Sequence, residues 1–133
     1  MSLIRSHKEL IVWRKAMDAG MEVFHVSEKF PAQERFSMTD QIRRATRSVA
    51  SNIAEAWRKR RYRAAFVAKL SDAETEAAET QTHLEFARRC GYLDDRQTDS
   101  LDARYEEILS MLVTMENNPE KWCLPSGTDK KKN

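Results

Sequence analysis

The segment from Phe66 to Ala87 places small or apolar side chains on a single helix face without interruption. They step alternately by four and three residues over three heptads: Phe66, Leu70, Ala73, Ala77, Thr80, Leu84 and Ala87. This is the period of a helix that buries one stripe against its neighbours. Gly91 follows where a left-handed residue commonly ends a helix. A long helix with so many small seam residues needs other helices packed closely against it, which favours an all-α fold.

Three other segments carry helix signals, and only three glycines and three prolines interrupt the 133 residues. Capping-box patterns at Ser6 and Ser37 and the acidic pair Asp94–Asp95 mark helix starts. The predicted helices cover about residues 6–29, 37–58 and 94–117. Four helices with short links predict an antiparallel up-down-up-down four-helix bundle over residues 1–118. Residues 119–133 are predicted to form an adherent segment followed by a disordered tail.

The first predicted helix carries more apolar surface than one bundle can bury. One row contains Leu10, Trp13, Met17 and Phe24, and a second contains Val12, Ala16, Ala19, Val23 and Val26. Together the two rows cover roughly 200° of the helix, about twice the stripe that a surface helix needs. We therefore predict self-association, with the second row as the oligomer interface.

Residues 41–63 hold the strongest charge imbalance of the chain. This window contains eight basic residues and one acidic residue, Glu55, so its net charge is +7, whereas the net charge of the whole chain is +2. Cations along a helix face and turn can bind a phosphate backbone without reading its sequence. The neighbouring Trp57 either anchors packing in the bundle or stacks on bases. The candidate nucleic-acid-binding residues are Arg43, Arg44, Arg47, Trp57, Arg58, Lys59, Arg60, Arg61 and Arg63.

A competing role exists for Arg43, Arg44 and Arg47, because residues 91–118 sum to −5 from two basic and seven acidic side chains. The three arginines can pair with that acidic surface in the same chain or in a neighbouring subunit. The alternative function is then a protein assembly or adaptor module, whose charges serve subunit contacts.

Ser48, Asn52 and Glu55 lie on the flank between the apolar and basic faces of the second predicted helix. With no histidine nearby in sequence to complete a catalytic group, we interpret the three as a structural polar network that sets helix register.

Enzyme and cofactor signatures are missing from the sequence. A di-metal bundle needs Glu-x-x-His on two helices, and only Glu22-x-x-His25 has that spacing. Cys90 and Cys123 form no zinc or disulfide pattern, and no glycine-rich phosphate loop occurs. We predict a non-enzymatic protein without metal or cofactor. Because no signal peptide or membrane span is evident, we expect it in the cytoplasm and away from membranes.

Three sequence stretches carry a family resemblance: LIVWRKAMD, FPAQERFSMTDQIRRATRSVASNIAEA and HLEFARRCGYL. Over roughly residues 9 to 115 the chain resembles the bacterial ribosomal-RNA intervening-sequence proteins. The family pattern Q-I-R-R-A is matched by Gln41–Ala45, and S-x-x-x-N-I-A-E by Ser48–Glu55. Ala50 and Ala56 replace the usual proline and glycine, so the second helix is expected to be straighter and longer than in its relatives.

The resemblance implies a four-helix bundle that assembles as a homopentameric ring. It also implies kinship with the accessory protein of diversity-generating retroelements, which associates with nucleic acid and a reverse transcriptase. From residues and resemblance together we expect an oligomer, a pentamer, that binds RNA or DNA, with a protein partner as the alternative.

Overall fold

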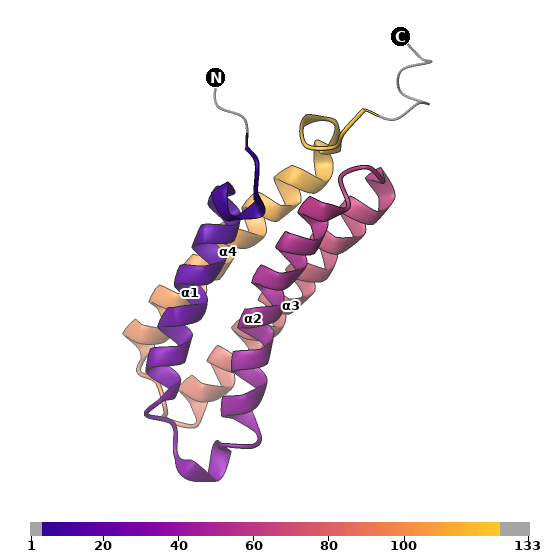
Figure 1. Ribbon diagram of the computed structural model, residues 1–133. Helices are drawn as coiled ribbons and strands as arrows, with labels where there is room; N and C mark the ends of the chain where they lie inside the picture. The colour runs from indigo at the N-terminus through magenta and orange to yellow at the C-terminus, as the bar shows by residue number, and fades with distance from the viewer. Residues whose placement is uncertain (1–3, 126–133) are drawn as a thin grey trace.

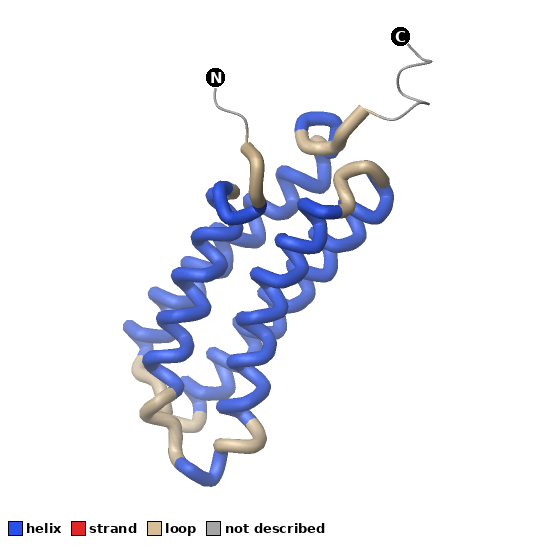
Figure 2. The backbone as a smooth tube through the Cα atoms, in the orientation of Figure 1, coloured by secondary structure: helices blue, strands red, loops and turns tan. Residues whose placement is uncertain are grey.

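The structure is a computed structural model that describes residues 4–125. The four α-helices are α1 (Ile11–Ser27), α2 (Met38–Arg58), α3 (Arg63–Arg89) and α4 (Asp95–Asn117). Three short 3₁₀ helices accompany them: η1 (His7–Glu9), η2 (Ala32–Glu34) and η3 (Pro119–Lys121). The part of the chain that the structure describes contains no strand (Figure 2). The predicted all-α four-helix bundle is confirmed.

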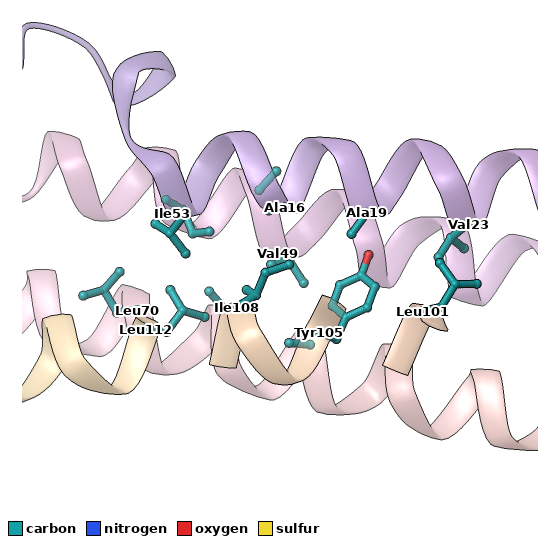
Figure 3. Close-up of a cluster of buried hydrophobic side chains, with 14 of the residues drawn as sticks. Ala16, Ala19, Val23, Val49, Ile53, Leu70, Leu101, Tyr105, Ile108 and Leu112 are labelled. Carbon is teal, nitrogen blue, oxygen red and sulfur yellow. The ribbon is translucent and has the colours of Figure 1, made fainter. Parts of the chain in front are cut away.

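The chain reverses direction at each connection, so each helix runs back along its predecessor (Figure 1). Helix α1 packs on α2 and α4, and α3 packs on the same two helices, which closes a ring around one core. All seven predicted seam residues of α3 are buried, as is the α4 stripe of Leu101, Tyr105, Ile108, Leu112 and Met115. Tyr105 is the largest fully buried side chain, and it points toward α1 near Ala19 (Figure 3).

Two of the predicted helix starts differ from the observed ones. The Ser6–Glu9 capping box forms, but it opens η1, because the extended backbone of Leu10 separates η1 from α1. Ser37 does not cap α2 with its side chain, and instead its hydroxyl donates to Glu34 Oε1 at 2.6 Å. Glu34 also accepts a hydrogen bond from the Tyr92 hydroxyl at 2.9 Å. One carboxylate therefore joins the α1–α2 connection to the α3–α4 connection.

Helix α3 ends as its sequence predicts. Gly91 adopts the left-handed φ of 80°, and the Tyr92 N–H donates to the Ala87 carbonyl at 2.8 Å. This hydrogen bond and the one from Gly91 to Arg88 satisfy carbonyls that the helix end would leave unpaired. Asp94 and Gln97 then form a capping box at the start of α4.

The segment after α4 lies against the α2–α3 turn. Trp122 is half-buried and packs on the core, and the Leu124 N–H donates to the Arg60 carbonyl at 3.0 Å. The predicted disordered tail beyond residue 125 lies outside the described residues. Within residues 4–125, no helix combines the length and apolar character that crossing a membrane requires.

Candidate nucleic-acid interface

The structure gathers five of the predicted cations at the turn between α2 and α3. We call residues 58–63 the basic turn, which contains Arg58, Lys59, Arg60, Arg61, Tyr62 and Arg63. Four of its cations, Arg58, Lys59, Arg61 and Arg63, are exposed, and within residues 4–125 none of their side chains forms an ion pair or a hydrogen bond. The first turn of α3 holds no acidic residue. These charges are available to an anionic ligand.

The only acidic residue in the basic window does not weaken this charge. Glu55 lies one turn earlier on α2, and its carboxylate pairs with Lys69 Nζ at 3.4 Å. Because Lys69 neutralises Glu55, the field at the turn is set by its own cations.

Trp57 was expected either to anchor packing or to stack on bases, and its burial favours packing. The side chain is only 5% exposed, and the Arg60 guanidinium carbon lies 3.5 Å from the ring centroid. Arg60 Nε also donates to the Trp57 carbonyl at 2.8 Å. Burial, followed by repulsion from Arg58, lowers the pKa of Arg60, which nevertheless stays cationic. Arg60 and Trp57 thus form the inner layer of the turn.

Arg43, Arg44 and Arg47, the three predicted arginines in the first half of α2, make different contacts. Arg43 Nε donates to Ser27 Oγ at 2.9 Å, and its guanidinium lies 4.5 Å from the Phe24 ring centroid. Arg43 therefore stabilises the end of α1, and two of its nitrogens, Nε and Nη2, donate hydrogen bonds to that helix. Arg44 is exposed and pairs with Asp40 one turn away at 2.9 Å. Arg47 is exposed and has no ion-pair partner within residues 4–125.

The predicted polar network does not form. Asn52 Nδ2 donates to the Ser48 backbone carbonyl at 2.9 Å, and Glu55 faces solvent beside Lys69. No hydrogen bond joins Asn52 to Glu55 in the described structure. The reason is position, because Glu55 lies at the surface edge of the α2–α3 seam and not within it. Asn52 makes a local contact within α2, whereas Glu55 joins α2 to α3 through Lys69.

The second apolar row of α1 does not form the exposed surface that the predicted oligomer interface requires. Val12, Ala16, Ala19 and Val23 are buried in the core of the chain itself, and Val26 packs against that core. Met17 and Met21 are instead 40% and 49% exposed, with Trp13 and Phe24 half-buried beside them. The surplus apolar surface exists, but it lies on the first row beyond Leu10, which is itself buried. Small and β-branched residues suit the close approach of helices, whereas tryptophan and methionine remain outside.

A groove of about 460 Å³ runs between α1 and α2 along this outer row. Its apolar walls include Trp13, Met17, Met21, Phe24, Thr46 and Ala50. His7, Arg43 and Arg47 also line it, and no carboxylate does. We call it the α1–α2 groove. The sequence signal for this groove was the first apolar row of α1.

Acidic residues gather on α3 and α4, away from the α1–α2 groove. Glu116 of α4 lies near Glu74 of α3, and burial, followed by this neighbouring carboxyl, raises the pKa of Glu116 to about 8. Glu22 and His25 are both exposed, and His25 approaches Glu28 at 3.5 Å. Within the described residues no cluster of three or more histidine, cysteine or acidic side chains is arranged to hold a metal ion.

Comparison with known proteins finds the same architecture in a solved structure and identifies a family. A solved structure described as a protein with unknown function from the S23 ribosomal protein family of Bacteroides thetaiotaomicron has a TM-score of 0.72 and 30% identity. The match covers 80% of this chain and 98% of that one. No match was found among curated proteins. The model of the 23S rRNA-intervening sequence protein family matches residues 8–114, so the chain belongs to that family.

Proposed function

We propose that this protein is a non-enzymatic cytoplasmic homo-oligomer that binds RNA or DNA through the basic turn, without strong sequence specificity. The observation that carries the proposal is the set of four exposed cations, Arg58, Lys59, Arg61 and Arg63, that have no ion-pair partner within residues 4–125. Cations already paired with carboxylates gain little from a phosphate, because they must first give up a partner. Unpaired cations release condensed counterions from the nucleic acid when they bind.

Removal of two turn arginines tests this proposal. The double variant Arg58→Ser, Arg61→Ser should bind structured RNA and duplex DNA more weakly. The slope of log K against log salt should fall by about two, since each lost phosphate contact removes roughly one unit. Fluorescence anisotropy titrations at several salt concentrations measure both quantities.

The matched control is Arg35→Ser, Arg44→Ser, which removes the same charge from exposed positions near the start of α2. The control should bind like the wild type. Equal losses in both double variants, or a wild-type protein that does not bind at low salt, contradict the proposal.

The α1–α2 groove supports the oligomeric part of the proposal, with a second copy of the chain as its occupant. No carboxylate lines the groove, and Arg47 on its wall has no intramolecular ion-pair partner within the described residues. Helix α4 holds six acidic and two basic residues, which leaves −4. A groove on one copy and an acidic helix on the next are different surfaces, and such a heterologous contact closes a ring when its rotation allows. A pentamer is the ring that the family resemblance implies.

Met17→Glu, Met21→Glu tests the assembly, because it places carboxylates in the groove where the acidic α4 of a neighbour would lie. Both positions are exposed, so the fold should persist while the oligomer dissociates. Light scattering after size exclusion gives the mass. The control Ile11→Glu alters an exposed apolar residue of α1 outside the groove and should remain oligomeric. A monomeric wild type at micromolar concentration contradicts the assembly.

The same groove favours a second candidate function, an adaptor that binds a different protein. Arg47→Glu distinguishes the two, because it alters the groove and leaves the basic turn intact. Loss of the oligomer with retained nucleic-acid binding supports the first function. An unchanged oligomer shows that Arg47 does not serve a contact between copies, and this result supports the adaptor.

A further inference from the structure

The basic turn presents one aromatic ring to solvent. Tyr62 is 63% exposed and has an extended backbone with φ −121° and ψ 97°. Its backbone is fixed, because the Tyr62 N–H donates to the Lys59 carbonyl and the Tyr62 carbonyl accepts from Phe66 N–H, each at 2.9 Å. Its side chain makes no hydrogen bond or ring contact within the described residues. A rigid backbone therefore holds a free ring.

The surroundings of this ring are cationic on both sides along the chain. Arg61 and Arg63 are its neighbours in sequence, and both are exposed without an ion-pair partner in the described structure. The other aromatic side chains near the turn are less accessible: Trp57 is covered by Arg60, Phe66 is buried, and Trp122 is half-buried against the core. Tyr62 is the ring that a ligand of the turn would meet.

A free ring beside unpaired cations matches the chemistry of unpaired nucleotides. Each unpaired base offers a π-face for stacking, and the strand offers a phosphate on either side of it. In a duplex the π-faces are occupied by neighbouring base pairs, and exposing one requires unstacking. Phosphate contacts alone bind either form, whereas a stacking ring favours the unpaired one.

We propose that the basic turn binds unpaired nucleotides of RNA or DNA, with Tyr62 stacking on a base while Arg61 and Arg63 contact the flanking phosphates. This inference rests on the proposed nucleic-acid function and adds to it the structural class of the ligand. The hydrogen bond from Leu124 N–H to the Arg60 carbonyl holds the turn in shape, which reduces the ordering that binding requires.

Tyr62→Ala, with Tyr62→Phe as the matched control, tests the inference. The probes are a short fluorescent single-stranded RNA, the single-stranded DNA of the same sequence, and the corresponding duplex DNA. Wild type should bind the single strands more tightly than the duplex. Tyr62→Ala should weaken single-strand binding about tenfold, as loss of one base stack does, with duplex affinity and salt dependence unchanged. Tyr62→Phe should bind single strands like the wild type.

An abasic single strand provides an independent readout, because it keeps the phosphates and removes the stacking partner. Wild type should bind it as weakly as Tyr62→Ala binds the normal strand, and Tyr62→Ala should lose nothing further. The RNA and DNA arms identify which sugar the turn accepts, and a ring-dependent preference in either arm supports the inference.

Different results would contradict base stacking by Tyr62 and phosphate binding by the basic turn. If wild type binds both single strands and duplex and Tyr62→Ala weakens neither, or weakens both equally, stacking is overturned while phosphate binding stands. If wild type binds no probe at low salt, both are overturned. Circular dichroism melting of each variant confirms that the exposed substitution leaves the fold intact.

Discussion

Glu116 shows how one residue can tie the stability of the bundle to pH. Its pKa is raised from 4.5 to about 8 by burial and then by Glu74. In the folded protein near pH 7 the group is therefore mostly protonated, whereas in the unfolded chain it is ionised. Because the folded pKa is the higher one, this group contributes stability that is present in full below pH 4.5 and is lost as pH rises through about 8.

Glu116→Gln should therefore flatten the pH dependence of stability. Glutamine keeps the size of the neutral acid and carries no charge at any pH. The melting temperature of the variant should exceed that of wild type above pH 8, and the difference should shrink toward pH 4.5. Thermal melts followed by circular dichroism across this range measure the effect. A difference that stays constant with pH would contradict the assignment to Glu116.

At the residue scale, some site contacts follow from local sequence and others do not. Arg60 lies three residues after Trp57, a spacing at which helical side chains meet. That contact was open to prediction and was missed. The bond from Arg43 to Ser27 joins residues sixteen apart, and it depends on how α2 lies beside α1. No periodicity within either helix contains that information.

At the element scale, the helices themselves were predictable because each has a single dominant stripe. The predicted positions from Phe66 to Ala87 are all buried, and Gly91 ends α3 as expected. Helix α1 was the exception, because two apolar rows have equal periodicity. Side-chain size decided between them, since alanine and valine fit the narrow space between helices and Met17 does not.

Glu34 joins the α1–α2 connection to the α3–α4 connection through its bonds with Ser37 and Tyr92. The Ser37 hydroxyl, followed by the Tyr92 hydroxyl, lowers the pKa of Glu34. Because the pKa of Glu34 is lower in the folded protein, its ionised carboxylate contributes stability that is present above pH 4.5. This contribution is lost as pH falls through the folded-state pKa of Glu34.

Glu34→Ala should lower the melting temperature by a few degrees at neutral pH, because the carboxylate links two connections. Tyr92→Phe should lower it by less, since it removes one of the hydrogen bonds. The double variant should cost less than the sum of the single variants, because both remove the same Tyr92–Glu34 bond. Strict additivity would show that this bond contributes nothing.

At the scale of the whole molecule, charge is separated along and across the bundle. The basic turn lies at the end where the described chain begins and finishes, and the Glu34–Tyr92 link lies at the other (Figure 1). Acidic α4 contacts α1 and α3 but not α2, which carries Arg43, Arg44, Arg47 and Arg58. Such an arrangement gives each copy one cationic end and one anionic side.

The position of the basic turn at one end of the bundle has a consequence for avidity. Cyclic symmetry places equivalent atoms of all subunits in one plane, so in the proposed ring every turn lies on the same rim. A strand held by one turn then meets the next at a high effective concentration.

Met17→Glu, Met21→Glu should therefore weaken the binding of long single strands far more than that of short ones, although neither residue lies in the turn. Anisotropy titrations with strands of increasing length measure this ratio, and an equal loss at all lengths would mean that each turn acts alone.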